Sequence, residues 1–144
     1  MKYQELVDVY SALENTTKRL EKTQIISNFL LKLDSTTLEQ VGLLILGSIF
    51  PAWSDKEIGI GNKLVMQAVG EAVGVTPDKV EDAVRDQGDI GLACISLYAK
   101  KSQTTFFSQP LTIDFVFKNL RKLSEKSGAR STKRKIDIIL EMLS

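Results

Sequence analysis

Almost every segment of this chain repeats its apolar residues with the period of an α-helix. Near the N-terminus, for example, Leu6, Val9, Tyr10 and Leu13 fall on one stripe of a helix spanning residues 2–14. No segment sustains the alternation of apolar and polar residues that a half-buried strand shows. The pattern therefore predicts an all-α fold, a compact domain of about seven to eight helices with no substantial sheet.

Capping residues, glycines and prolines divide the chain into the expected helices. In chain order, we expect helices at 2–14, 18–33, 38–50, 59–73, 77–87, 90–101 and 113–126, and a last one that follows Ser131. The segment 102–111 is the one stretch whose composition could be extended. Without any linker or repeat, residues 1–144 read as a single helical domain.

The helix at 38–50 is apolar nearly all round, so we expect it at the buried centre of the domain. Thr36 and Glu39 have the spacing of a capping box that would open this helix. Trp53 lies in the loop that follows and is expected to plug the core. For Gly88 and Asp89 we expect a helix stop followed by a helix cap.

Composition excludes several kinds of chemistry. The chain has no histidine, which removes the commonest general base and transition-metal ligand, and we predict no catalytic and no metal-binding residues. A single cysteine, Cys94, excludes an internal disulfide and reads as a buried, inert thiol. The longest apolar run, 41–50, is too short to span a bilayer, so we expect a protein without membrane contact inside the cell.

The strongest functional signal is a cluster of cations near the C-terminus. The net charge is only +1, yet residues 118–135 contain eight basic residues and one acidic residue. We expect Ser131 to cap the last helix, which places Lys133, Arg134 and Lys135 in its first turn. A helix N-terminus favours anions, so cations there predict a bound anion such as a backbone phosphate.

Two weaker candidates accompany this cluster. The helix start created at Gly88 and Asp89 could face a phosphate, and Arg19 and Lys22 stand near another helix start. Ordinary solvated helix faces would also explain these charges. The alternatives left open are a helical protein-interaction module with an acidic partner and a small regulatory domain, neither with a nucleic-acid role.

Four segments, at 56–61, 87–93, 111–116 and 127–136, resemble motifs of one family. They are similar in order and spacing to its Glu-Leu-Gly-Val/Ile-Gly loop, its Gly-Asp-Leu/Val-Gly turn and its Leu-Thr and Gly-Ser…Lys-Lys-Ile regions. The family is the N-terminal DNA-binding domain of ATP-dependent DNA ligases of the archaeal and eukaryotic type. The resemblance covers nearly the whole chain.

The resemblance implies a helical domain that grips nicked duplex DNA through backbone phosphates from the minor-groove side, as part of an enzyme that encircles its substrate. The DNA-binding residues it implies lie at two turns, with a looser match near the N-terminus. They are Gly88, Asp89, Gly128, Ser131, Thr132, Lys133 and Lys135, with Arg19 and Lys22 as the looser match.

For the full enzyme, the resemblance implies ATP and Mg²⁺ as cofactors and nick sealing in replication, repair and recombination. A sliding clamp is a candidate partner of the full protein, and we expect a monomer in the cytoplasm, or in the nucleus of a eukaryote. The family's nucleophile motif is Lys-x-Asp-Gly, which Lys135-Ile136-Asp137-Ile138 mimics without the glycine. The catalytic domains are therefore expected after residue 144, so that 1–144 would be most of the DNA-binding domain, inactive and without a cofactor of its own.

Overall fold

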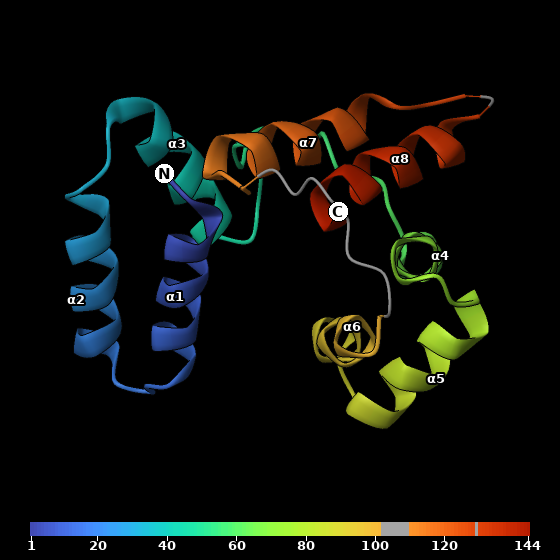
Figure 1. Cartoon of the computed structure of the whole chain (residues 1–144). Coiled ribbons are helices and arrows are strands. Elements are labelled where there is room, and N and C mark those ends of the chain that lie inside the picture. The colour runs from blue at the N-terminus through green and yellow to red at the C-terminus, as the bar shows by residue number, and fades with distance from the viewer. Residues whose placement is uncertain (102–109, 129) are drawn as a thin grey trace. The chain divides into compact units, whose positions relative to one another are not determined.

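The computed structural model describes residues 1–101, 110–128 and 130–144. Within these ranges the chain forms eight helices and no strand, apart from an isolated antiparallel bridge between Lys2 and Thr112, so the all-α prediction is confirmed. The helices, labelled in Figure 1, are α1 (Tyr3–Glu14), α2 (Arg19–Leu30), α3 (Ser35–Ile45), α4 (Asn62–Val73), α5 (Pro77–Gln87), α6 (Ile90–Ala99), α7 (Ile113–Glu125) and α8 (Ser131–Leu143). Most of the segment expected to be extended, residues 102–109, lies outside the described residues.

The contacts between residues group the chain into two compact units. The first comprises Met1–Glu57 and Pro110–Arg121, and so contains α1, α2, α3 and most of α7. The second comprises Ile58–Gln109, of which the structure describes 58–101, and Lys122–Ser144, and so contains α4, α5, α6 and α8. The single domain expected for residues 1–144 stays a prediction.

The first unit packs around the stripe that the sequence pattern predicts. Helices α1 and α2 contact each other and lie side by side (Figure 1). Leu6 and Val9 from α1 join Phe29, Val41 and Ile113 in one buried cluster. Because Ile113 opens α7, this cluster holds the N-terminal part of α7 against residues from the start of the chain. At that point, the side chain of Thr112 accepts a hydrogen bond from the backbone of α7, as expected of a cap.

The expected start of α3 is wrong. The helix begins at Ser35 because the carboxylate of Asp34 accepts a hydrogen bond of 2.9 Å from the backbone N–H of Thr37. Asp34 is therefore the N-cap, and Thr36 and Glu39 lie inside the helix and form no capping box. Aspartate is among the best N-cap residues, so Asp34 competes successfully with the later threonine.

The expectation that the helix at 38–50 forms a buried centre is also wrong. The helix ends at Ile45, and Gly47 follows in the left-handed conformation with φ of 70°. Within α3 only Gln40 and Val41 are buried, whereas Leu46 is 80% exposed. Trp53 is 89% exposed and plugs no core. Apolar composition alone thus overstated the burial of this segment.

The second unit is built around α4, which contacts α5, α6 and α8. Its C-terminus follows the predicted pattern, with Gly74 in the left-handed conformation and Pro77 at the start of α5. Gly70 makes this turn tight, because a Cβ atom at this position would lie 2.8 Å from the carbonyl oxygen of Val75. In the described residues, no helix combines the length and apolarity needed to cross a lipid bilayer.

Candidate nucleic-acid interface

The N-terminus of α8 is formed by a turn rather than by a side-chain cap. Ser131 is the first residue of the helix, not its cap, and its N–H donates to the carbonyl of Gly128 at 3.1 Å. Arg130 occupies the N-cap position with φ of 67°, and it is the one described non-glycine residue with positive φ. Gly128 also has positive φ, of 81°. An arginine in this conformation costs about 1–2 kcal/mol of backbone strain, which the surrounding turn must offset.

The cations are spread over more of α8 than the sequence predicts. With the helix beginning at Ser131, Lys133 is in the first turn, whereas Arg134 and Lys135 are in the second. Lys133 forms an ion pair with Asp137, with 2.9 Å between Nζ and Oδ1. The hydrogen bond to Asp137, together with the charge of that carboxylate, raises the pKa of Lys133 above its usual value. Lys133 is therefore exposed but already has an anionic partner.

Lys135 forms a structural contact. Its Nζ donates a hydrogen bond of 2.6 Å to the carbonyl of Gly59, in the loop before α4. Gly59 has φ of 66°, and a side chain there would approach the same ammonium, with 3.4 Å between Cβ and Nζ. Two segments that the sequence singled out, 56–61 and 127–136, are therefore adjacent in the folded unit. Sequence reasoning missed this contact because neither segment indicates its distant partner.

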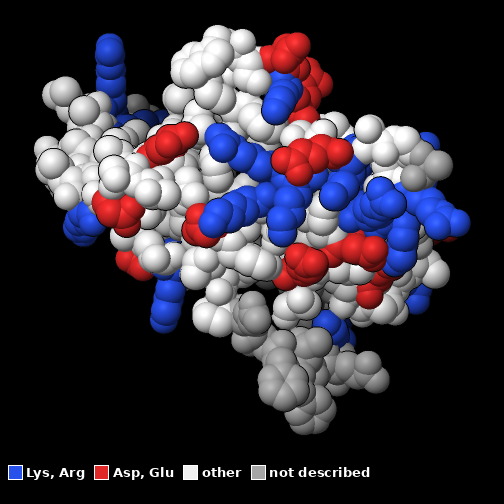
Figure 2. Space-filling view, turned by 90° about the horizontal axis from the view of Figure 1, so that it is seen from above, with Lys and Arg blue, Asp and Glu red and all other residues white. Residues whose placement is uncertain are grey.

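Arg130 and Arg134 differ from these lysines. Both side chains are exposed, and neither has a side-chain partner among the described residues. In Figure 2, Lys and Arg side chains lie with several Asp and Glu side chains among them. The sequence analysis counted Arg134 among the cations at the start of this helix, but neither arginine is among the DNA-binding residues that the resemblance implies. The signal that could have separated them is Asp137, whose spacing of four residues favours pairing with Lys133.

The turn at Gly88 and Asp89 has the structure predicted for it. Gly88 ends α5 with φ of 75°, and the carboxylate of Asp89 caps α6 by accepting from the N–H of Leu92 at 2.9 Å. This carboxylate already supplies an anion to the N-terminus of α6. The N–H of Gly88 is also engaged, because it donates to the carbonyl of Val84 at 2.8 Å, so a phosphate at this turn would have to compete with one of these two contacts.

Among the described residues, no hydrogen bond or ion pair joins the Gly88–Asp89 turn to the N-terminal end of α8. A hydrogen bond between α6 and α8 joins their C-terminal ends, from the hydroxyl of Tyr98 to the carbonyl of Leu143 at 2.6 Å. Gly88 precedes the opposite end of α6, and Gly128 precedes the opposite end of α8.

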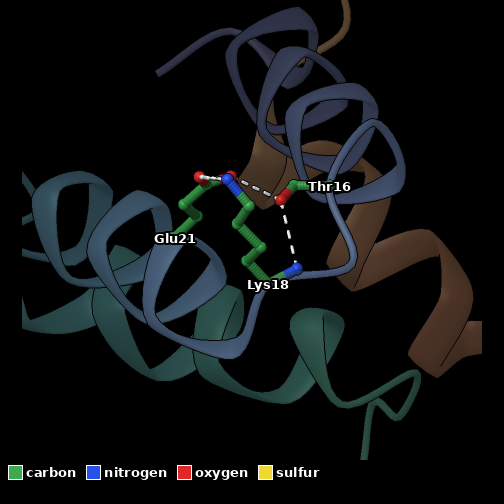
Figure 3. Close-up of polar contacts among 3 residues, drawn as sticks. All are labelled: Thr16, Lys18 and Glu21. Atoms are coloured by element: carbon green, nitrogen blue, oxygen red, sulfur yellow. Dashed lines mark hydrogen bonds and ion pairs between the residues drawn. The ribbon is translucent and has the colours of Figure 1, made fainter.

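Arg19 and Lys22 belong to the first unit, at the start of α2. The neighbouring Lys18 is engaged locally, because its Nζ lies 3.1 Å from Glu21 and its N–H donates to Thr16 (Figure 3). Thr16 in turn donates to Glu21, and this bond, followed by that of Lys18, lowers the pKa of the Glu21 carboxyl. Arg19 and Lys22 remain exposed on either side of Glu21, and their role as DNA contacts stays a prediction.

No side chains suited to a metal or to covalent chemistry gather in the part of the chain that the structure describes. No group of three or more His, Cys, Asp or Glu residues lies close enough there to hold a metal ion. Cys94 is half-buried, and burial, followed by the charge of Asp89, raises the pKa of its thiol. A raised pKa disfavours the reactive thiolate. What the geometry offers instead is a set of exposed cations.

Comparison with known proteins identifies the origin of this architecture. The chain is 99% identical over 144 residues to a DNA ligase of Methanobrevibacter smithii, and the match covers all of this chain and 26% of that protein. It is 51% identical over 142 residues to a DNA ligase of Methanothermobacter thermautotrophicus, covering 99% of this chain and 26% of the relative. A DNA ligase of Thermococcus onnurineus is 45% identical over 136 residues, covering 94% of this chain and 24% of the relative. The chain spans about a quarter of the length of these relatives. The family described as "DNA ligase N terminus" matches residues 2–144, and the chain therefore belongs to the N-terminal domains of DNA ligases.

Proposed function

We propose that this domain holds nicked duplex DNA through its backbone phosphates, so that the catalytic part of the ligase can seal the nick. The observation that carries the proposal is the pair of exposed arginines at the start of α8, Arg130 and Arg134, whose side chains have no partner among the described residues. Arginine is well suited to phosphate, since its planar guanidinium can donate two parallel hydrogen bonds to it.

The other predicted DNA-binding residues differ in whether their side chains are already engaged in the structure. Lys133 reaches a phosphate only by leaving Asp137, and Lys135 only by leaving Gly59. Gly128 and Thr132 would offer backbone N–H groups near the start of α8, and Ser131 its hydroxyl, since its N–H donates to Gly128. Gly88 and Asp89 would form a second, separate contact. Arg19 and Lys22 would add a contact from the first unit.

The domain supplies positioning rather than chemistry in this proposal. The full ligase would join a 3′-hydroxyl to a 5′-phosphate through a lysyl-adenylate and adenylated DNA, with ATP and Mg²⁺, in DNA replication, repair and recombination. Among the described residues, no group of three or more His, Cys, Asp or Glu side chains could hold a metal ion, and Lys135, in the segment that mimics the nucleophile motif, donates to the carbonyl of Gly59. We therefore assign the chemistry to the remaining three quarters of the protein, and a sliding clamp remains a candidate partner. Because the relatives are archaeal, we place the full enzyme in the cytoplasm.

The proposal predicts DNA binding that is independent of base sequence and depends strongly on salt concentration. Phosphate contacts carry no sequence information, and the log–log slope of affinity against salt should be about −0.9 for each phosphate neutralised. The test is to titrate full-length ligase with two nicked duplexes of unrelated sequence across a salt series. Equal affinities with a steep slope support DNA contact. Binding that does not respond to salt, or a preference for an acidic peptide over duplex DNA, would favour the protein-interaction alternative.

A further inference from the structure

Lys133 and Asp137 form an ion pair that contributes little to the stability of α8. Their side chains are 67% and 53% exposed, so water screens the 2.9 Å contact between Nζ and Oδ1. The lysine precedes the aspartate by four residues, which is the weaker order, because the cation then lies near the positive N-terminal end of the helix. On α7 the order is the reverse, with Asp114 before Lys118. Helix stability therefore does not explain the pair on α8.

A second carboxylate acts on the same ammonium group. The hydrogen bond to Asp137 and the charge of that residue raise the pKa of Lys133, and the charge of Glu71 on α4 raises it as well. Helices α4 and α8 pack against each other inside the second unit. The protein thus carries a cation where the helix dipole disfavours one, and two of its own carboxylates balance the charge of that cation.

The ion pair lies on the face of α8 that also carries the two exposed arginines. At about 100° per residue, four residues fall within about 100° of one another around the helix axis: Arg130, Lys133, Arg134 and Asp137. The arginine side chains have no partner among the described residues, so a phosphate would meet them first. Asp137 would then act against that phosphate in two ways, since its charge repels the phosphate and its carboxylate engages the ammonium of Lys133.

We propose that Asp137 withholds Lys133 from the phosphates of duplex DNA and thereby limits the affinity of the ligase for its substrate. The inference rests on the proposed function, because it concerns how strongly the same face of α8 binds DNA. The carboxylate of Asp137 and a phosphate oxygen compete for one ammonium group. Asp137 is fixed one helical turn away from Lys133, so it is always present as the competitor, and Lys133 adds little to DNA binding while Asp137 is in place.

The test compares Asp137→Asn with the wild type in a full-length ligase that carries this N-terminal sequence, by fluorescence anisotropy with a labelled nicked duplex across a salt series. Freeing one more cation should steepen the log–log salt slope by about 0.9. Between about 50 and about 200 mM salt, the variant should therefore lose about 3.5-fold more affinity than the wild type, from a tighter value at the lower salt concentration. In a Lys133→Gln background, Asp137→Asn should leave the slope unchanged. Asp137→Glu keeps a carboxylate at this position and should bind as the wild type does.

Glu141→Gln is the matched control, because it removes the same charge from an exposed position one turn further along α8, and it should not change the slope. Three results would each overturn the inference: a wild-type slope in Asp137→Asn, a steeper slope that persists without Lys133, or an equal effect of Glu141→Gln. A wild-type ligase whose DNA binding does not respond to salt would overturn the proposed function together with this inference. A steep wild-type slope that Asp137→Asn leaves unchanged would overturn this inference alone.

Discussion

Replacing the two exposed arginines of α8 should separate DNA affinity from fold stability. The variant combines Arg130→Gly with Arg134→Gln in the full-length ligase. Glycine suits the positive φ of 67° at position 130, so the first change removes a charge while relieving backbone strain. Glutamine is a good helix former, so the second change keeps α8 intact. Thermal stability should stay the same or rise.

The change in the salt dependence of DNA affinity can be estimated from the number of cations removed. If each arginine neutralises one phosphate, the salt slope for nicked duplex becomes shallower by about 1.8. Over a fourfold rise in salt, from about 50 to about 200 mM, that difference amounts to a factor of about 12. The wild-type ligase should therefore lose about 12-fold more affinity than the variant across this range, as measured by fluorescence anisotropy with a labelled nicked duplex.

The control is Arg85→Gln on α5, whose guanidinium is already paired with Glu81 and Asp82. This substitution removes the same type of charge, and it should leave the salt slope unchanged. The reasoning fails if the double variant retains the wild-type slope, or if Arg85→Gln alters the slope as much as the double variant does. Lys133→Gln provides a ranking, since its pairing with Asp137 predicts a smaller effect than that of either arginine.

Three further predictions concern the fold. Gly70→Ala should destabilise the protein by about 1–3 kcal/mol in denaturant titrations, because the new Cβ would lie 2.8 Å from a backbone carbonyl oxygen. Gly42→Ala is the matched control: no atom lies within 4 Å of its Cβ position, so it should stabilise α3 by about 0.5–1 kcal/mol. Asp34→Ala should lower the melting temperature by about 2–4 °C through loss of the cap, and Thr36→Ala should not, so equal effects would contradict the assignment. The hydrogen bond from Lys118, and next that from Gln40, lowers the pKa of the Asp114 carboxyl, so the ionised Asp114 stabilises the fold above the usual pKa of 3.8 and this stabilisation fades as the pH falls below it. The stability lost in Asp114→Asn should therefore shrink between about pH 6 and about pH 2. A loss of stability that does not depend on pH would contradict this.

The sequence predicts the helices well where local signals act alone. The positions of Gly74, Pro77, Gly88 and Asp89 are correct because φ preference and capping are decided within a few residues. The cap of α3 was misplaced because two candidate caps stand within two residues of each other. Burial was misjudged at Trp53 for a different reason, since exposure depends on what else the fold brings near a side chain.

Prediction of the site was limited in the same way, because contacts between residues distant in sequence leave no local signal. That Lys133 pairs with Asp137 follows from a spacing of four residues, and the sequence contained that signal. That Lys135 binds the carbonyl of Gly59 could not be predicted, because the two residues are 76 positions apart and a backbone carbonyl has no sequence signature. The positive φ of Arg130 was also out of reach, since arginine rarely adopts it and only the surrounding turn imposes it.

These contacts change what the resemblance to the ligase family means for individual residues. The motif segments at 56–61 and 127–136 meet through the hydrogen bond from Lys135 to Gly59, so these two residues have a structural contact that is independent of DNA. A shared fold would preserve that contact whether or not DNA is bound. Lys135 already has a structural contact, and its role as a DNA contact stays a prediction. The cations whose presence the fold itself does not explain, Arg130 and Arg134, are the stronger candidates for phosphate contact, because exposed charges without partners contribute little to stability.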